Sequence, residues 1–303
     1  GYRRFRLPTV AQAIPPAMYQ RLTRALQTWR DWQVEGLQTA PRPLRQLGCG
    51  LNNHSYLVAS GSHRFALRLA GKKLAANPAW QCAEWQALAL AHSAGLAPAP
   101  RHLDTKAGVL VCDYLPPDTN VAENLATVGA LLRRIHALPQ LTPGPTLAER
   151  CEAAASAVRS VQPGTWQQLQ VLAARVGPML TRLEDAGPQG LCHNDLLRAN
   201  RVTSGGELWA IDWEYAASGP VWFDLAAVCA GDELDSPARR ALLTGYLRTA
   251  PAAPDWQRLN LFECGYRYLE LLWHIETATD PAAASLAEKQ SRLARCIDAT
   301  DAH

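Results

Sequence analysis

Residues 193–200 of this chain read HNDLLRAN, and residues 210–214 read AIDWE. Between them lie two short strand-like runs separated by Ser204-Gly205-Gly206, a hairpin turn signal. Folding about that turn brings Asn200 and Asp212 roughly opposite each other. The two segments therefore predict a loop followed by a hairpin, which together gather oxygen-bearing side chains.

Three of these side chains suit the transfer of a phosphoryl group from ATP. Transfer needs a carboxylate that orients and deprotonates the attacking hydroxyl, and oxygen ligands that hold Mg²⁺ against the phosphates. We therefore predict Asp195 as the catalytic base and Asn200 and Asp212 as the magnesium ligands. Each residue alone would also suit a turn or a cap. The combined spacing, with a hydrophobic-Asp-aromatic step after the hairpin, favours phosphoryl transfer.

This pattern resembles the catalytic loop and metal-binding segment of the aminoglycoside phosphotransferase and choline kinase superfamily, relatives of protein kinases. The resemblance covers Leu44 to about His274 and is strongest from Leu191 to Val228. Residues 211–216, IDWEYA, are especially similar to choline, ethanolamine and thiamine kinases. The loop departs from the common form at residues 197–199, which hold no essential ligand.

The resemblance implies an α+β, protein-kinase-like fold with two lobes, a small N-lobe built on an antiparallel sheet and a larger, mainly helical C-lobe. We expect residues 1–43 to form an N-terminal helical extension, 44–112 the nucleotide-binding N-lobe, and 113–303 the catalytic and acceptor-binding C-lobe. Within the extension, Pro16 to Leu37 is expected to be a helix that braces the small lobe, covers the cleft or mediates dimer contacts.

A glycine-containing turn is predicted in residues 47–58, LGCGLNNHSYLV. Glycine lets backbone amides approach phosphates closely, so Gly48, Gly50 and Asn52 are candidate nucleotide-binding residues. An ordinary hairpin turn would have the same composition, and the following strand decides between the two.

The next strand, RFALRLA at residues 64–70, alternates between two faces. Ala66 is expected to pack on adenine and Arg68 to reach the phosphates. Kinases usually carry Lys here, paired with a helix Glu. Arg68 resembles the choline kinase side of the superfamily and would bind phosphate through a planar fork of donors. Glu84 is its predicted partner, although a surface Arg and an exposed helix Glu would look the same.

Residues 108–117 are predicted to be a buried strand that leads into an extended linker, resembling the hinge between kinase lobes. The backbone around Cys112 to Tyr114 is expected to hydrogen-bond the adenine edge. Beyond it, apolar spacing predicts four helical segments. These segments are Leu125–Leu138, Leu147–Val161, Trp166–Leu183 and Pro237–Tyr246.

Further candidates surround the loop. His193 is expected to anchor it, and Asp224 to occupy the first turn of a helix, where the dipole favours a carboxylate and where the resemblance implies that it braces the loop. Glu214, on the same side as Asp212 if the segment is extended, would touch the metal's water shell or the acceptor. Tyr266 and Trp273 could wall the acceptor through cation–π contacts, or belong to the core.

Composition and cysteine spacing limit the kinds of partner and site expected for this chain. The chain has 303 residues, a formal net charge of +3 and no basic block interleaved with aromatics, so we expect no nucleic-acid partner. Its eight cysteines lack any C-x-x-C pair, which argues against a zinc site. Without a predicted leader or membrane span, we expect a cytoplasmic protein with no membrane partner, monomeric or homodimeric.

The sequence thus predicts an ATP- and Mg²⁺-dependent kinase that phosphorylates a hydroxyl of a small amino alcohol such as choline, ethanolamine or thiamine. An aminoglycoside or amino-sugar kinase is the alternative enzyme. A nucleotide-binding pseudokinase is the alternative outside catalysis, disfavoured by the intact Asp195, Asn200 and Asp212.

Overall fold

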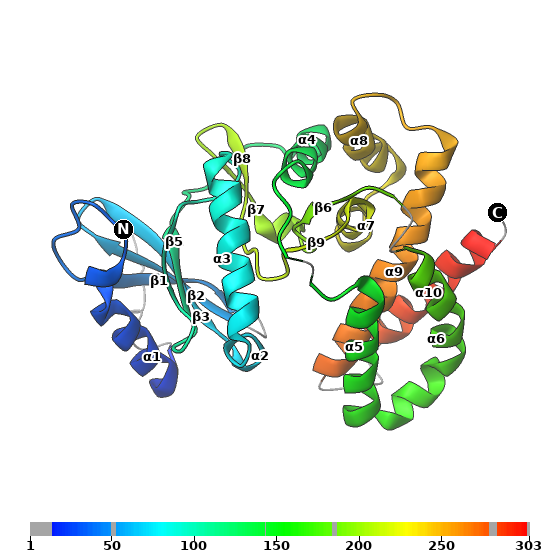
Figure 1. The fold of residues 1–303 in the computed structure, drawn as a ribbon, viewed down its shortest axis with the longest axis horizontal. Coiled ribbons are helices and arrows are strands. Elements are labelled where there is room, and N and C mark those ends of the chain that lie inside the picture. Colours follow the sequence, from blue (N-terminus) through cyan, green and yellow to red (C-terminus); the bar gives the residue numbers. More distant parts are fainter. Residues whose placement is uncertain (1–13, 50–52, 143, 184–186, 279–283, 302–303) are drawn as a thin grey trace, which may run out of the picture. The chain divides into compact units, whose positions relative to one another are not determined.

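The computed structural model describes residues 14–49, 53–142, 144–183, 187–278 and 284–301. Its contacts divide the chain into two compact units, residues 1–116 and 117–303, called here the N-terminal and C-terminal units. Figure 1 shows the sheet of the first unit and the helices of the second.

The N-terminal unit is built on a five-stranded antiparallel sheet in the order β1-β2-β3-β5-β4. The strands are β1 (Arg42–Cys49), β2 (Asn53–Ser60), β3 (His63–Ala70), β4 (Pro100–Asp104) and β5 (Val109–Asp113). Sequence alternation did not indicate β4. It begins with a proline, which cannot donate to a ladder and is tolerated at the start of an edge strand.

Helix α1 (Pro16–Gln27) packs on one face of this sheet. Its Leu22 and Leu26 are buried against the β3 residues Phe65 and Leu67, in the alternation expected for this strand. Each such side chain contributes about 1.5–3 kcal/mol when fully buried. The guanidinium of Arg21 also donates to the Ala70 carbonyl at 2.9 Å. The helix therefore braces the sheet.

This helix ends ten residues earlier than the expected end at Leu37. A 3₁₀ turn, η2 (Trp29–Asp31), follows, and Trp32 has extended backbone angles. The Trp32 ring then packs edge-on against Phe65, with centroids 5.3 Å apart. Burial of this indole explains why the chain leaves the helix, which sequence periodicity does not reveal.

The opposite side of β3 faces the second helical layer of the unit, α2 (Lys72–Ala75) and α3 (Pro78–Ser93). Helix α3 buries Gln81, Glu84 and Leu88. Because Arg68 alternates with Phe65, Leu67 and Leu69, its side chain emerges on the α3 side of the sheet.

The C-terminal unit is mainly helical. Its helices are α4 (Leu125–His136), α5 (Leu147–Val161), α6 (Pro163–Leu183), α7 (Val221–Gly231), α8 (Ser236–Leu247), α9 (Ala253–Thr277) and α10 (Ala284–Asp301). Two small antiparallel ladders pair β6 (Gln189–Cys192) with β9 (Ala217–Pro220) and β7 (Arg201–Ser204) with β8 (Glu207–Ala210). The four segments predicted to be helical correspond to α4, α5, α6 and α8. Helix α10 was not anticipated, although its buried residues Leu286, Leu293 and Ile297 follow helical spacing.

Helices α4 and α8 cross at a contact that depends on two glycines. A Cβ at Gly129 would lie 2.1 Å from the Leu242 carbonyl oxygen, and one at Gly245 would lie 2.0 Å from that of Ala126. Hydrogen in place of a side chain therefore permits backbone-to-backbone packing at this crossing.

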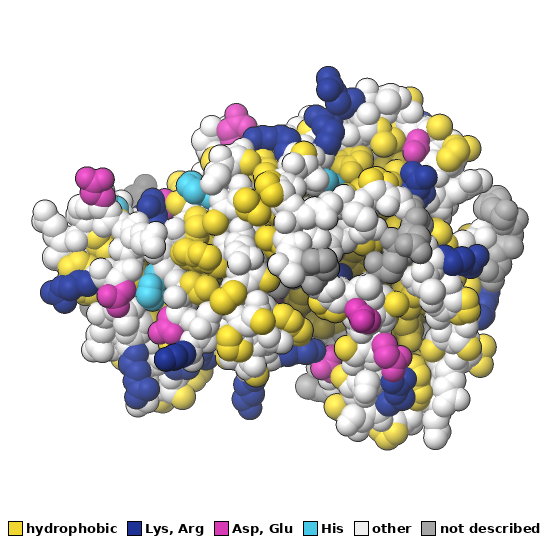
Figure 2. Space-filling view, in the orientation of Figure 1, with side chains coloured by type: hydrophobic (Ala, Val, Ile, Leu, Met, Phe, Trp, Pro, Cys, Tyr) yellow, Lys and Arg dark blue, Asp and Glu magenta, His cyan; other side chains and the backbone are white. Residues whose placement is uncertain are grey.

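The surface gives two observations. On the face drawn in Figure 2, the described Lys and Arg side chains stand in separate small groups and form no continuous stripe. Among the described helices, none has an apolar run long enough to cross a membrane.

Candidate active site

The loop that follows β6 is held between the two small ladders. It closes with a 3₁₀ turn, η3 (Arg198–Asn200), and Asn200 leads directly into β7. The expected hairpin is present, with Arg201 opposite Ala210. The Ile211 N–H donates to the Asn200 carbonyl at 3.0 Å, so the residue before Asp212 lies against Asn200.

The Asn200 side chain binds the candidate base directly. Its Nδ2 donates to the backbone oxygen and to Oδ2 of Asp195, each at 2.8 Å. With Nδ2 used in this way, the amide oxygen of Asn200 accepts no hydrogen bond from the described residues and could bind a cation.

Negative charge gathers around Asp195. Its pKa is raised to about 7, chiefly by burial and then by the carboxylates of Asp212 and Glu214, while the hydrogen bond from Asn200 lowers it. A divalent cation among these groups would relieve their repulsion. Carboxylate and amide oxygens are the ligands that Mg²⁺ prefers, so this donor set fits that ion.

The segment after the hairpin is not extended, so the condition under which Glu214 would share a side with Asp212 is not met. Asp212 has a φ of 61°, in the left-handed region, and Glu214 and Tyr215 form a turn. Glu214 therefore does not share a side with Asp212 through strand alternation, although both carboxylates act on Asp195. Asn194, at a φ of 64°, is a second left-handed residue next to the base. Such conformations persist where surrounding contacts fix them and are common at functional sites.

Asp224 provides those contacts. It lies in the first turn of α7, is fully buried, and accepts the backbone N–H of His193 at 2.7 Å and that of Asn194 at 2.5 Å. The Asn194 side chain donates in turn to the Tyr215 carbonyl at 2.9 Å. Asp224 therefore fixes the backbone immediately before Asp195 and acts as a positioning residue.

His193 is an anchor by geometry. Its Nε2 lies 3.0 Å from the Ile211 carbonyl oxygen, and its ring packs on Trp213 with centroids 4.8 Å apart. Burial lowers the pKa of His193, so the imidazole is neutral and donates through Nε2. The histidine thus ties the loop to the segment that carries Asp212.

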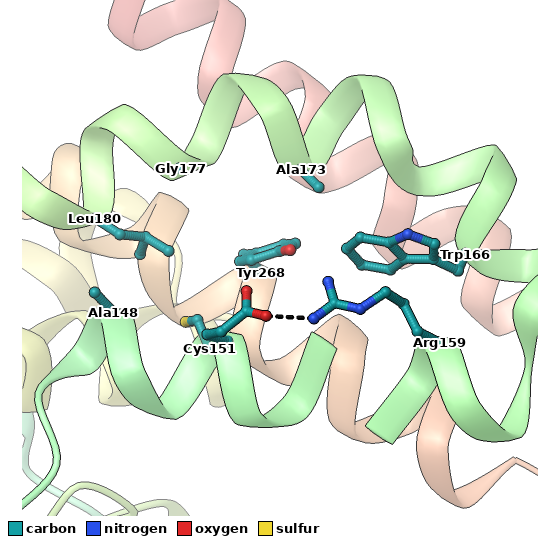
Figure 3. Close-up of a pocket in the computed structure, with 9 residues that line it drawn as sticks. Ala148, Cys151, Arg159, Trp166, Ala173, Gly177, Leu180 and Tyr268 are labelled. Carbon is teal, nitrogen blue, oxygen red and sulfur yellow. Dashed lines mark hydrogen bonds and ion pairs between the residues drawn. The ribbon is translucent and has the colours of Figure 1, made fainter. Parts of the chain in front are cut away.

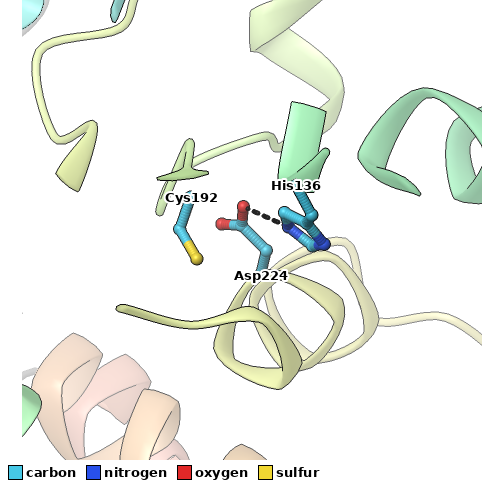
Figure 4. Close-up of side chains that lie close together, drawn as sticks. All are labelled: His136, Cys192 and Asp224. Carbon is cyan, nitrogen blue, oxygen red and sulfur yellow. Dashed lines mark hydrogen bonds and ion pairs between the residues drawn. The ribbon is translucent and has the colours of Figure 1, made fainter. Parts of the chain in front are cut away.

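A second layer extends to α4. His136 lies between Asp224 and Tyr246, with Nε2 3.0 Å from Oδ2 and Nδ1 2.9 Å from the phenol oxygen. Figure 4 shows His136, Cys192 and Asp224 converging, an arrangement that could hold a metal ion. Both Asp224 oxygens are already used by the loop, and burial raises the pKa of Cys192, which keeps its thiol protonated. The cluster is therefore best described as an anchor.

A buried cation that sequence reasoning missed supports the other end of the loop. Arg201 donates to the Leu196 carbonyl and to Glu123, each at 2.8 Å, and pairs with Asp232 at 2.8 Å. Asp232 also accepts the Arg198 backbone N–H at 3.0 Å. An alternating strand pattern treats Arg201 as surface, so the sequence offered no signal for this role.

The two aromatic candidates on α9 differ. Tyr266 is buried, and burial together with the carboxylates of Glu270 and Asp195 raises the pKa of its phenol. Its hydroxyl lies near Leu197 of the loop, because a Cβ at Gly231 would lie 2.6 Å from the hydroxyl and 2.5 Å from Leu197 Cδ2. Trp273 is half-buried and packs on His274. The structure therefore brings Tyr266 near Asp195 and gives no described contact between Trp273 and the loop.

In the N-terminal unit, the expected pair of Arg68 and Glu84 is present. The two side chains form a bidentate ion pair with one N–O distance of 2.6 Å, and both residues are buried. Ala66 lies on the same side of β3, paired with Cys112 of β5. The packing of Ala66 against adenine stays a prediction.

At the hinge, the structure shows which backbone donors already have partners. The N–H of Asp113 donates to Ala99 and that of Tyr114 to Arg64, so the sheet already uses both donors. Leu115 carries the first N–H beyond the sheet without a backbone acceptor among the described residues, and Pro116 and Pro117 have no N–H. Of the turn candidates, Gly48 pairs with Ser55 in the β1–β2 ladder, whereas Gly50 and Asn52 lie outside the described residues.

The sequence model of the phosphotransferase enzyme family matches residues 43–262. The chain belongs to this family. The match confirms the family resemblance drawn from the catalytic loop, and it spans both units of this phosphotransferase.

Curated relatives and solved structures agree. Thiamine kinases of Escherichia coli O139:H28 and Shigella flexneri are each 30% identical over 234 residues, covering 72% of this chain and 77% of theirs. A choline kinase from Streptococcus pneumoniae superposes with a TM-score of 0.73 at 20% identity, covering 93% of this chain and 99% of that one. A choline/ethanolamine kinase family protein from Mesorhizobium loti superposes with a TM-score of 0.65 at 20% identity, covering 91% of this chain and 93% of that one. The expected kinase-like fold is confirmed, and this phosphotransferase is a small-molecule kinase.

A cavity of this phosphotransferase lies elsewhere in its C-terminal unit. It has a volume of about 300 Å³ between α5, α6 and α9 (Figure 3). Tyr268 projects into it, and Arg159 stacks on Trp166 at its edge while pairing with Glu152. None of its lining residues belongs to the catalytic loop, so it is not assigned to the chemistry.

Proposed function

We propose that this kinase transfers the terminal phosphoryl group of ATP to a hydroxyl of a small cationic alcohol, of which thiamine is the first candidate and choline and ethanolamine are the next. The observation that carries the proposal is the set of oxygens around Asp195, in which Asn200 orients the base while Asp212 and Glu214 add negative charge.

Asp195 is the proposed base. It would orient the acceptor hydroxyl and accept its proton as the oxygen attacks phosphorus. A pKa near neutrality suits a group that must take up and release a proton. The buried anchor of Asp224 holds the loop backbone, so that the carboxylate is positioned before the acceptor arrives.

Asn200, through Oδ1, and Asp212, through its carboxylate, are the proposed Mg²⁺ ligands. The ion would neutralise charge on the transferring phosphate. The protein's own contribution is to fix both ligands, because the Ile211–Asn200 backbone bond couples the two segments.

The N-terminal unit supplies the proposed nucleotide contacts. Arg68, held by Glu84, would bind phosphate oxygens, and Ala66 would pack on the adenine ring. The adenine edge would bind the Leu115 N–H and the carbonyls of Cys112 to Tyr114, with Gly48, Gly50 and Asn52 near the phosphates.

The acceptor preference rests on charge and on the curated relatives. A cation would be attracted by the negative charge of Asp195, Asp212 and Glu214 and could lie against aromatic rings of α9, for which Tyr266 and Trp273 are the candidates. Thiamine combines a fixed positive charge with a primary hydroxyl. The named function of relatives 30% identical to this chain supports placing it first.

An acceptor screen tests the proposal. Purified protein with ATP and Mg²⁺ is assayed for ADP release with thiamine, choline, ethanolamine, amino sugars and aminoglycosides, and the product is identified by mass. We expect the highest kcat/KM with a small cationic alcohol, and a phosphomonoester as product. Turnover confined to aminoglycosides or amino sugars would contradict the acceptor assignment while leaving the kinase assignment intact.

A further inference from the structure

Two cysteines meet where α10 lies on α9. The Sγ atoms of Cys264, on α9, and Cys296, on α10, are 2.7 Å apart. Cys264 is buried, whereas Cys296 is partly exposed. One sulfur of the pair can therefore be reached from solvent, and the other is already in contact with it.

The surroundings favour a thiolate at this position. Thr300 Oγ1 lies 3.4 Å from Cys264 Sγ, one turn beyond Cys296 on the same helix. The hydrogen bond from Cys296, helped by that from Thr300 and opposed by burial, lowers the pKa of Cys264. The same contact, together with burial, raises the pKa of Cys296, so the thiolate forms on Cys264. A thiolate is the nucleophile in thiol–disulfide exchange, and this one lies 2.7 Å from the sulfur of the partly exposed Cys296.

We propose that Cys264 and Cys296 are a covalent modification site, at which a low-molecular-weight disulfide such as oxidised glutathione converts the two thiols into a disulfide that cross-links α10 to α9. The site is separate from the candidate catalytic residues and does not depend on the proposed acceptor.

The chemistry balances with one oxidant molecule. A thiolate of the pair attacks one sulfur of oxidised glutathione, forming a mixed disulfide and expelling one glutathione thiolate. The second protein thiolate attacks the protein-bound sulfur, which forms the Cys264–Cys296 bond and expels the second glutathione. The two protons lost by the protein thiols end on the two glutathione thiols, so the protein is oxidised by two electrons and glutathione disulfide is reduced.

The cross-link closes a loop of about 30 residues, which restricts the unfolded chain and stabilises the folded one. For a chain of this size the expected rise in the thermal midpoint is about 5 °C or more. Turnover should be retained, because both sulfurs lie outside the groups placed around Asp195.

The test uses the full chain under native conditions. After incubation with oxidised glutathione and removal of the reagent, intact mass and non-reducing peptide maps are recorded, together with thermal midpoints before and after dithiothreitol. We expect a mass lower by two hydrogens, a linked peptide pair containing Cys264 and Cys296, and a raised midpoint that dithiothreitol reverses. Cys296→Ser should abolish all three, whereas Cys82→Ser, at an exposed thiol in the N-terminal unit, should abolish none.

Other outcomes would overturn the proposal. They are a stable glutathione adduct on Cys296 without a link, a link that forms only after the chain is unfolded in denaturant, or a linked dimer in place of an intramolecular bond. A protection experiment does not depend on the stability of the variant. In denaturant, Cys264 of the reduced protein should react with an alkylating reagent. After oxidation by glutathione disulfide, Cys264 should resist the same reagent under the same conditions.

Discussion

The side-chain amide of Asn200 donates a hydrogen bond to the carboxylate of Asp195 across 2.8 Å. One residue thus orients the proposed base with its nitrogen and offers its oxygen to a cation. The two proposed roles of the loop, proton acceptance and metal binding, are mechanically linked through this side chain.

Replacing Asn200 should therefore damage both roles. For Asn200→Ala we expect turnover to fall by about 10²-fold or more, together with a higher Mg²⁺ concentration for half-maximal rate, because a ligand and the Asp195 contact are lost together. Initial rates over a Mg²⁺ titration measure both effects. Glu207→Gln, on the exposed part of the same hairpin, serves as the control. An unchanged Mg²⁺ dependence in Asn200→Ala would show that Asn200 is not a ligand.

The raised pKa of Asp195 predicts a stability effect with a definite sign. The folded-state pKa of Asp195 is about 7, above the ordinary 3.8, so the folded chain binds this proton more tightly than the unfolded chain. The resulting contribution to the free energy of unfolding is fully present below pH 3.8 and is lost as pH rises through 7. Asp195→Asn does not titrate. In metal-free buffer it should thus be more stable than wild type above pH 7, by on the order of 2–4 kcal/mol, with the difference shrinking toward pH 4.

Denaturant unfolding at several pH values checks this expectation. The lowered pKa of His193 reduces stability below pH 6.5 in both proteins, so it cancels in the difference. An Asp195→Asn variant that is less stable than wild type at pH 8 would contradict the account of charge crowding at the loop.

The buried ion pair of Arg68 and Glu84 predicts that two arginines of β3 differ strongly in their effect on stability and ATP binding. Arg68→Ala leaves a buried carboxylate uncompensated, so we expect a loss of about 3–5 kcal/mol in stability as well as a raised KM for ATP. Arg64→Ala removes an exposed cation from the same strand and should change neither. Equal effects of the two substitutions on the KM for ATP would argue against a role of Arg68 at the phosphates.

Because α4 and α8 touch through glycine, replacing glycine by alanine should have opposite effects on stability at this contact and at an open position. Gly245→Ala would force Cβ against the Ala126 backbone and should destabilise by about 1–3 kcal/mol or more. Gly164→Ala, in the exposed first turn of α6 where nothing lies within 4 Å, should stabilise by about 0.4–1 kcal/mol. The thermal midpoints of the two variants measure these effects. An unchanged midpoint in Gly245→Ala would show that α4 and α8 can move apart without loss of stability.

Sequence reasoning found the parts of the site that carry local signals. The spacing of Asp195, Asn200 and the hairpin predicted the arrangement around Ile211, because strand pairing fixes it within a few residues. The partner of Arg68 could be predicted because the resemblance to kinases implies a helix Glu beside this cation, and Glu84 lies in the next helical stretch.

The remainder depends on contacts between distant segments. Arg201 is held by Glu123 and Asp232, which lie far from it in sequence, and no periodicity marks a buried ion pair of that kind. The left-handed backbone at Asp212 likewise has no local sequence signal, so the sequence could not decide whether Asp212 and Glu214 share a side. Helix α1 ends before its expected end because Trp32 packs on Phe65, a contact that local helix propensity does not predict.

The most direct test of the central claim is the rate of phosphoryl transfer by Asp195→Asn, measured beside its affinity for ATP. The substitution keeps an oxygen that can accept from Asn200 and removes the group that takes the proton. We predict a fall in kcat of about 10²–10⁴-fold with ATP affinity within a few-fold of wild type. A variant that keeps nearly full kcat would contradict the assignment of Asp195 as the catalytic base.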